Sequence, residues 1–244
     1  MTDHVKLQTK NGALWITLNR PDCGNLITMS MIRTLTETLQ SIPDDIKIVV
    51  IDAEGDEFCK GRDYSEAPED AAKGKKPSAL DIRTRMTAPI IDFYSTIKSA
   101  SVPTVSVVQG AAAGFGCALA CACDIVIAGD RARFSLPEMN ERGLPPTLAM
   151  TALLDRVNLR TLVYLVFGTE QIGAAAALSA GLVSAVEPHQ TLREKAIVFA
   201  AHVCSQPGDS IRAVKDYLKL APQMQPTGRA ALGSGLYAIV AGSR

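Results

Sequence analysis

The amino-acid sequence predicts an α/β fold with a helical C-terminal region, and two observations carry this prediction. Up to Pro146, short apolar runs typical of buried strands alternate with amphipathic segments typical of helices. Beyond Pro146, almost every segment has helical periodicity. We place the α/β core at residues 1–190 and the helical region at residues 191–244, where it either covers the core or packs against another subunit.

The first predicted elements are a hairpin and a helix. Residues 5–9 alternate in polarity, Asn11 and Gly12 supply a tight turn, and the second strand covers residues 13–18. Ser30 is the expected N-cap of a helix over residues 31–41, because a serine hydroxyl accepts a hydrogen bond from an unpaired helical N–H.

The rest of the core alternates strands and helices. A helical pattern covers residues 78–100, with a kink expected at Pro89. Residues 66–77 have the charged, small-residue composition of a mobile surface loop. Buried strands are predicted at residues 46–52, 104–108 and 125–128, and a further short strand at 183–186. Helices are predicted at residues 147–156, 159–167, 172–180, 189–204, 208–220 and 227–240.

Composition narrows the class of protein. The chain has 244 residues, 47% of them hydrophobic, with 25 basic and 25 acidic side chains. This balance, without a basic stripe interleaved with aromatic residues, argues against binding to nucleic acid or to an anionic membrane. No apolar run is long enough to span a bilayer and the N-terminus lacks a secretion-signal pattern, so we expect a cytoplasmic protein.

The cysteines and histidines do not form a recognisable site. The six cysteines match neither a disulfide framework nor a zinc site of paired CxxC knuckles, so we expect small buried hydrophobic residues and no bound metal. None of His4, His189 and His202 accompanies a serine or cysteine in a nucleophilic motif, which disfavours a histidine-dependent triad.

The most informative segment is a glycine-punctuated turn within residues 108–124, which leads from an apolar strand directly into an apolar helix. Gly110, Gly114 and Gly116 allow a sharp turn and a close approach of the backbone to a ligand. Because the helix begins there, unpaired N–H groups and the positive end of the helix dipole face the turn. Such a corner either stabilises negative charge on an oxygen or is only a tight connection packed in the core.

A second glycine-bearing turn, at residues 57–64, also follows a buried strand, and with both turns the chain resembles the crotonase family, also called the enoyl-CoA hydratase/isomerase family. The resemblance extends over about residues 5–240, and the motifs occur in the family's order. The matching segments are 18–25 (LNRPDCGN), 58–63 (FCKGRD), 110–117 (GAAAGFGC), 123–128 (CDIVIA), 134–138 (FSLPE), 143–145 (GLP) and 180–188 (AGLVSAVEP).

This resemblance implies a crotonase-like (ClpP/crotonase) fold, a spiral of repeated strand-strand-helix units with a C-terminal helical region that trimerises. It implies an acyl-CoA thioester substrate, a role in fatty acid metabolism and a homotrimer or hexamer. Coenzyme A enters as part of the substrate, and no permanently bound cofactor is expected. Family members commonly continue with another basic helix, so for a sequence ending at Arg244 we expect weaker recognition of the adenine nucleotide.

In that family two backbone amides bind the thioester oxygen and stabilise an enolate. By position, the donors here are the amides of Arg62 and Phe115, and the catalytic carboxyl group is that of Glu138. Family hydratases use two glutamates, and the first falls at Ala118, which can neither orient water nor move a proton. The resemblance therefore favours an enoyl-CoA isomerase, which needs only one acid, over a hydratase.

Several side-chain roles follow from these positions. Apolar neighbours such as Phe134, Leu136 and Leu144 are expected to raise the pKa of Glu138. The side chain of Arg62 faces either the thioester and acyl chain or a phosphate or carboxylate, whereas Asp63 has the position of a structural turn residue. The expected substrate-binding residues are Cys23, Leu26, Cys59, Gly61, Asp63, Tyr64, Ala112, Gly114, Pro137 and Leu144.

Three alternatives stay open. One is another enolate reaction of the family, namely hydratase-like, hydrolytic or decarboxylating chemistry. The second, from a different class, is a non-catalytic acyl-CoA-binding protein. The third concerns charge: Arg20, Lys60 and the lysines at 73, 75 and 76 either follow the phosphates of coenzyme A or are solvated surface cations.

Overall fold

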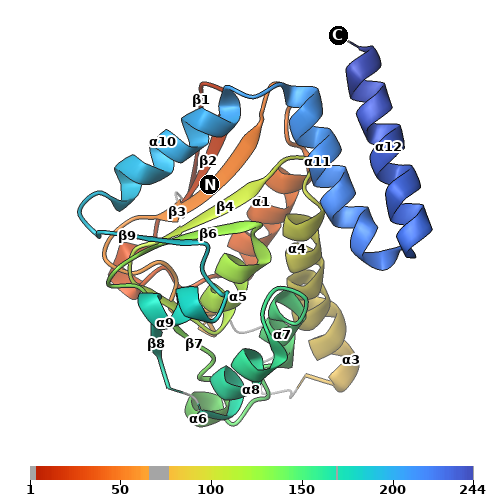
Figure 1. The fold of residues 1–244 in the computed structure, drawn as a ribbon. Helices are drawn as coiled ribbons and strands as arrows, with labels where there is room; N and C mark the ends of the chain where they lie inside the picture. Colours follow the sequence, from red (N-terminus) through yellow and green to blue (C-terminus); the bar gives the residue numbers. More distant parts are fainter. Residues whose placement is uncertain (1–3, 66–76, 169, 244) are drawn as a thin grey trace.

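The computed structural model describes residues 4–65, 77–168 and 170–243, so the loop predicted at residues 66–77 lies outside the described residues except for Pro77. A six-stranded sheet of order β1-β2-β3-β4-β6-β9 forms the centre of the molecule (Figure 1). Its first pair is antiparallel and all other pairs are parallel, which confirms the predicted hairpin and the buried strands. The strands are β1 (Val5–Lys10), β2 (Ala13–Leu18), β3 (Ile48–Ala53), β4 (Thr104–Val108), β6 (Ile125–Gly129) and β9 (Ala185–Glu187).

Helices cover both faces of this sheet, which explains why its parallel strands are continuously apolar. In β3, Val49 and Ile51 belong to the larger apolar cluster under α1, α4 and α5. The alternate residues, Ile48 and Val50, pack on the other face under α10. The helices are α1 (Met29–Gln40), α3 (Ala79–Ile82), α4 (Ala88–Ser99), α5 (Phe115–Ala122), α6 (Glu138–Arg142), α7 (Thr147–Leu153), α8 (Leu159–Gly168), α9 (Ala174–Ser179), α10 (Leu192–Cys204), α11 (Gly208–Leu220) and α12 (Pro226–Gly242).

A second, smaller sheet organises the chain into repeated units. It has the order β5-β7-β8, formed by β5 (Ala111–Ala113), β7 (Arg133–Ser135) and β8 (Ile172–Gly173). The chain runs from β4 to β5 to α5, and then from β6 to β7 to α6, so each unit places one strand in the large sheet, one in the small sheet, and then a helix. This arrangement confirms the expected strand-strand-helix repeat.

Three local predictions need correction. The N-cap of α1 is Thr28, whose hydroxyl accepts a hydrogen bond from the amide of Met31, and Ser30 lies inside the helix. The helix predicted over 78–100 is divided by a π-helical turn, Arg83–Thr87, which ends two residues before Pro89, and Pro89 lies in the first turn of α4. The first two residues of the helix predicted at 172–180 form the strand β8 instead, because Ile172 pairs with Phe134.

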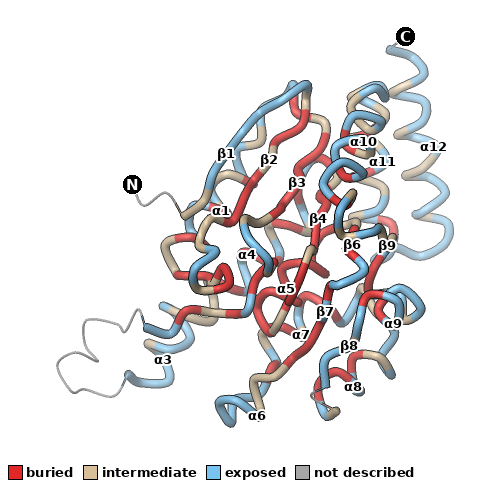
Figure 2. The backbone as a smooth tube through the Cα atoms, turned by 90° about the vertical axis from the view of Figure 1, so that its left-hand side faces the viewer, coloured by how far each residue is buried: buried red, intermediate tan, exposed pale blue. Residues whose placement is uncertain are grey.

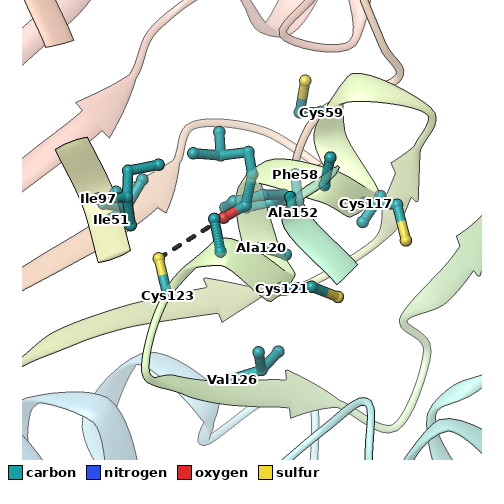
Figure 3. Close-up of a cluster of buried hydrophobic side chains, with 14 of the residues drawn as sticks. Ile51, Phe58, Cys59, Ile97, Cys117, Ala120, Cys121, Cys123, Val126 and Ala152 are labelled. Atoms are coloured by element: carbon teal, nitrogen blue, oxygen red, sulfur yellow. Dashed lines mark hydrogen bonds between the residues drawn. The ribbon is translucent and has the colours of Figure 1, made fainter. Parts of the chain in front are cut away.

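The cysteines lie mostly in the core, as predicted. Cys59, Cys117, Cys121 and Cys123 are buried among apolar side chains of α5 and its neighbours (Figure 3). The thiol of Cys123 donates to the carbonyl of Leu119 one turn earlier in α5. Cys23 and Cys204 are only partly buried, and all six are free thiols.

The C-terminal helices differ in how they contact the core. Helix α10 contributes Leu192, Ala196 and Ala200 to the smaller apolar cluster. Helix α11 is fastened by Lys215, 3% exposed, whose ammonium group donates to both carboxylate oxygens of Asp124. Helix α12 has no buried residue and lies outermost, beside α11 (Figures 1 and 2). Among the described residues, no helix is long and apolar enough to cross a membrane.

Candidate active site

The register of neighbouring strands brings three predicted site segments to one edge. Cys59 pairs in parallel with Ala112, and Ala112 pairs in parallel with Phe134. Each of these residues is followed three positions later by a predicted site residue, namely Arg62, Phe115 and Pro137. Because parallel neighbours advance together along the chain, the three segments end side by side. Glu138 follows directly after the third.

The first corner, residues 58–63, lies between the early loop and β5. Its backbone faces β5 at Cys59, whose amide donates to the carbonyl of Ala111. Gly61 has φ +122 and reverses this direction, so the carbonyl of Gly61 and the amide of Asp63 face Ile27. Since successive residues of extended backbone point their amides to opposite sides, the amide of Arg62 points away from Ile27, toward the second corner.

The second corner, residues 110–116, presses against the first. A β-carbon at Gly116 would overlap the carbonyl oxygen of Cys59, so only glycine permits this approach. Phe115 is the first residue of α5, and its amide has no acceptor among the backbone hydrogen bonds of the described residues. The Phe115 ring stacks on Phe93 at 5.9 Å between centroids and contacts Tyr94 at 5.3 Å, which fixes the start of the helix against α4.

Glu138 places a carboxyl group at the second corner. Its Oε1 lies 2.8 Å from the point where a β-carbon at Gly114 would stand. Its Oε2 is buried and has no hydrogen-bond partner among the described residues. Loss of hydration raises the pKa of Glu138, and the nearby negative charge of Glu141 raises it further, in the direction predicted from the apolar neighbours. Of these neighbours, Phe134 and Leu136 are fully buried, whereas Leu144 is 48% exposed.

Tyr94 joins the site from α4 and was not foreseen. It is 2% exposed, and burial raises the pKa of its phenol well above the ordinary value. The negative charge of Glu138 adds to this shift, whereas the positive charge of Arg62 opposes it. The hydroxyl is neutral and is available as a hydrogen-bond donor.

The first corner is supported by side chains with structural roles. Arg20 donates to the carbonyl of Leu26 and forms an ion pair of 2.9 Å with Asp63. Hydrogen bonds from Ser65 and the Arg20 guanidinium lower the pKa of Asp63 to about 2, so the carboxylate is ionised and held by these contacts. Asn25, fully buried with φ 55, donates to the carbonyls of Glu54 and Glu57. Its buried side chain is a structural requirement that the sequence reading missed.

The other predicted residues are distributed around these groups. Cys59 and Ala112 are fully buried and contribute paired backbone; burial raises the pKa of the Cys59 thiol to about 12, so this thiol is neutral. Gly61 and Gly114 form the two turns, and Pro137 precedes Glu138 at the start of α6. Cys23 and Leu26 are partly buried in the early loop, and Tyr64 and Leu144 are exposed.

The position of the first family glutamate is filled by a buried alanine. Ala118 lies one turn into α5, is fully buried, and donates its amide to the carbonyl of Gly114. Glu141, the other carboxylate that acts on Glu138, is exposed on α6. Among the described residues, no cluster of three or more histidine, cysteine or carboxylate side chains is arranged to hold a metal ion.

Two arginines contact Tyr64 beside this site. The guanidinium carbon of Arg62 lies 4.7 Å from the centroid of the Tyr64 ring, and that of Arg142 lies 3.9 Å from it. Arg142 belongs to α6, one helical turn after Glu138. Sequence reasoning missed Arg142, because it predicted no helix over residues 138–142 to bring this side chain near Glu138.

Comparisons with known proteins agree with this arrangement. A family model described as Enoyl-CoA hydratase/isomerase matches residues 8–237. The rat Enoyl-CoA hydratase domain-containing protein 3, mitochondrial, is 30% identical over 80% of this chain and 63% of its own length. The 2,3-dehydroadipyl-CoA hydratase of Escherichia coli (strain K12) is 31% identical over 84% of this chain and 78% of its own length. The chain spans only 61% to 65% of the rat, Xenopus laevis and human domain-containing proteins.

Solved structures share the fold. The human enoyl Coenzyme A hydratase domain-containing protein 3 superposes with a TM-score of 0.87 and 25% identity, over 96% of this chain and 90% of that one. An enoyl-CoA hydratase/isomerase from Marinobacter aquaeolei superposes with a TM-score of 0.89 and 23% identity, over 98% of this chain and 91% of that one. The path of the chain through both sheets is therefore the same in these proteins.

Proposed function

Because this chain belongs to the enoyl-CoA hydratase/isomerase family, whose crotonase fold it shares, we propose that it is an acyl-CoA enzyme that shifts a carbon–carbon double bond. The observation that carries the proposal is the presence of Glu138 together with Ala118. One carboxyl group lies at the second corner, and the position where a hydratase of the family has its other acid is a fully buried alanine.

The proposed reaction is a proton transfer in two steps. The carboxylate of Glu138 removes a proton from the α-carbon of a β,γ-unsaturated acyl-CoA, and the electron pair moves into the thioester carbonyl to form a dienolate. The amides of Arg62 and Phe115 donate to the resulting oxyanion; one such donor lowers the barrier by about 3 kcal/mol. Glu138 then returns the proton to the γ-carbon, which leaves an α,β-unsaturated thioester.

The environment of Glu138 suits this shuttle. A raised pKa brings the carboxyl group closer to the acidity of the carbon that it must deprotonate and reprotonate. Hydration would also require a group that orients water from the side of α5, where Ala118 has no polar atom in its side chain. We therefore favour isomerisation, although the relatives are named hydratases.

The test is turnover of a β,γ-unsaturated acyl-CoA, followed by the ultraviolet absorbance of the conjugated product. Wild-type protein is expected to turn over, whereas Glu138→Gln is expected to lose about a hundredfold or more in rate. Glu141→Gln is the matched control, because it removes an exposed carboxylate from the same short helix. No turnover by the wild type, or full activity of Glu138→Gln, contradicts the proposal.

A broad acyl-CoA panel separates the alternatives. Water addition to an α,β-unsaturated acyl-CoA at a higher rate than isomerisation would identify a hydratase, and release of free coenzyme A would identify a hydrolase. Binding without any turnover would identify a non-catalytic acyl-CoA-binding protein. The names of the relatives do not select the acyl group, since they include both a dehydroadipyl and a hydroxycinnamoyl thioester.

We further propose that the protein acts as a homotrimer or hexamer. Large apolar side chains are exposed on the outer helices of this single chain, where a second copy would cover them. They are Leu159, Val163, Tyr164 and Phe167 on α8, Val214 and Leu218 on α11, and Tyr237 and Ile239 on α12. Light scattering of the purified protein measures the state, and a monomer at micromolar concentration contradicts this assembly.

A further inference from the structure

Two arginine side chains contact one aromatic ring beside the first corner. Arg62 of the first corner and Arg142 of α6 both contact Tyr64, at 4.7 Å and 3.9 Å from guanidinium carbon to ring centroid. Tyr64 is 37% exposed, so the cluster borders solvent or ligand. Each guanidinium is attracted to the face of the ring, so two positive charges lie beside one tyrosine.

The direction of Arg142 is informative. Glu138 and Arg142 stand four residues apart on α6, the spacing at which a glutamate and an arginine readily form an ion pair. They form none, and Arg142 has no carboxylate partner among the described residues. Contact with Tyr64 instead keeps this cation from acting on Glu138, whose pKa is raised and not lowered. The guanidinium of Arg142 can therefore bind an anion other than Glu138.

We propose that Arg62, Tyr64 and Arg142 form a binding site for a carboxylate carried by the acyl group of the substrate. A guanidinium presents parallel N–H donors that match the two oxygens of a carboxylate. An anion at the edge of the ring would be attracted by both positive charges. Tyr64 acts as a positioning residue that holds both arginines for this contact.

An acyl carboxylate fits this place better than a phosphate of coenzyme A. The inference rests on the proposed function, in which the amide of Arg62 binds the thioester oxygen and Glu138 meets the adjacent carbons. Arg142 lies one helical turn after Glu138, so both arginines belong to segments that this function places around the acyl group. The phosphates are separated from the thioester by the whole pantetheine arm. A cation on the residue that binds the thioester oxygen is therefore expected to contact the acyl group.

The experiment measures binding of unreactive saturated thioesters by calorimetry. Succinyl-, glutaryl- and adipoyl-CoA are compared with butanoyl-, pentanoyl- and hexanoyl-CoA, and each pair is repeated as the pantetheine thioester. Wild-type protein is expected to bind at least one carboxylated ligand about tenfold or more tightly than its neutral partner. Arg142→Gln should remove most of this preference and leave the affinity for the neutral ligand unchanged, and Arg62→Gln should also remove most of the preference.

The controls separate the possible outcomes. Arg33→Gln, which removes an exposed guanidinium from α1, should keep the full preference, and Arg142→Lys should keep part of it. Equal affinities within every wild-type pair overturn the inference, and so does an equal loss for both ligands in Arg142→Gln. A loss seen with coenzyme A thioesters but absent with pantetheine thioesters assigns the arginines to a phosphate and also overturns it. Because no ligand reacts, failure of isomerase turnover leaves this result unaffected.

Discussion

The two glycine corners and the C-terminal helices are held in place by different kinds of contact. In the corners, main-chain pairing at Cys59, Ala112 and Phe134 aligns the segments, and a β-carbon at Gly110 or Gly116 would overlap a neighbouring backbone. Helix α11 is held by side-chain contacts, namely buried Ile211 and Lys215 and the hydrogen bonds of Arg212, and α12 has no buried residue at all. Figure 2 displays the contrast as a buried centre beside the exposed helix α12.

The difference indicates which changes each region tolerates. A group positioned by backbone register is insensitive to its own side chain but sensitive to anything that separates the strands. A helix positioned by a few side chains is insensitive to most substitutions on its surface but sensitive to loss of those contacts. The same substitution should therefore have opposite consequences in the two regions.

The largest effect is expected from Gly116→Ala. Its β-carbon would overlap the carbonyl oxygen of Cys59, and two backbones must then move apart. A misplacement of about 1 Å at a reacting centre costs roughly a hundredfold in rate, and overpacking costs about 1–3 kcal/mol of stability. Steady-state kinetics with urea denaturation measures both losses. Wild-type rate and stability in this variant would show that the two corners do not depend on close contact.

Glu138→Gln should separate activity from stability. The rate is expected to fall by about 10²–10⁴, because the proton shuttle is lost, while thermal stability at neutral pH rises. The folded-state pKa is raised, so the wild type is relatively more stable at low pH and loses this stability as the pH rises through that pKa. The melting-temperature difference between the variant and the wild type should grow with pH. A difference that is independent of pH contradicts the raised pKa.

The wild-type rate should have a matching pH dependence. Glu138 must be ionised to accept the first proton, so kcat/KM should fall as the pH decreases through an apparent pKa above that of an ordinary glutamate. A pH–rate profile measures this pKa, with Glu141→Gln expected to lower it slightly, since Glu141 contributes negative charge. An acid limb at or below the ordinary glutamate value would remove the argument from desolvation.

Lys215→Met tests the anchor of the outer helices. It leaves the Asp124 carboxylate without its ammonium partner, and breaking a buried pair costs about 3–5 kcal/mol. Hydrogen exchange should accelerate in α11 and α12 while the amides of β4 and α5 stay protected. The double variant Lys215→Met with Asp124→Asn should recover part of the loss. Uniform acceleration through both regions would show that they unfold as one unit.

The smallest effect is expected from Gly235→Ala, the counterpart of the change at Gly116. Nothing lies within 4 Å of a β-carbon at this position of α12. Alanine should stabilise the helix by about 0.5–1 kcal/mol through the lower entropy of its unfolded backbone. Thermal denaturation measures the gain. A loss of stability here would mean that α12 is more tightly packed than its exposure indicates.

The sequence allowed the two glycine turns and the buried strands of the large sheet to be predicted, because glycine spacing and apolar periodicity are local signals, whereas Glu138 was assigned by resemblance to the family. The pairing that aligns the corners was not predictable. Strands β5 and β7 have three residues each, too few to show an alternating pattern. The contact of Arg142 with Tyr64 was missed for a related reason, since α6 has only five residues.

The errors at helix starts have a similar cause. Thr28 and Ser30 are both good N-cap residues, and the choice between them depends on where the chain leaves its bridge at Ile27. Asn25 reads as an ordinary loop residue, although its buried side chain joins the early loop to the first corner through Glu54 and Glu57. Tertiary contacts decided both cases.

The amide of Arg62 points toward the second corner because Gly61 reverses the backbone, and this direction would be the same for any residue at position 62. In the two proposals above, the main chain of Arg62 serves the reaction and its side chain serves recognition of the acyl group. Evolution could exchange the side chain to accept a different acyl group without rebuilding the chemistry. Position 62 is accordingly a place where laboratory selection could retune substrate range at little catalytic cost.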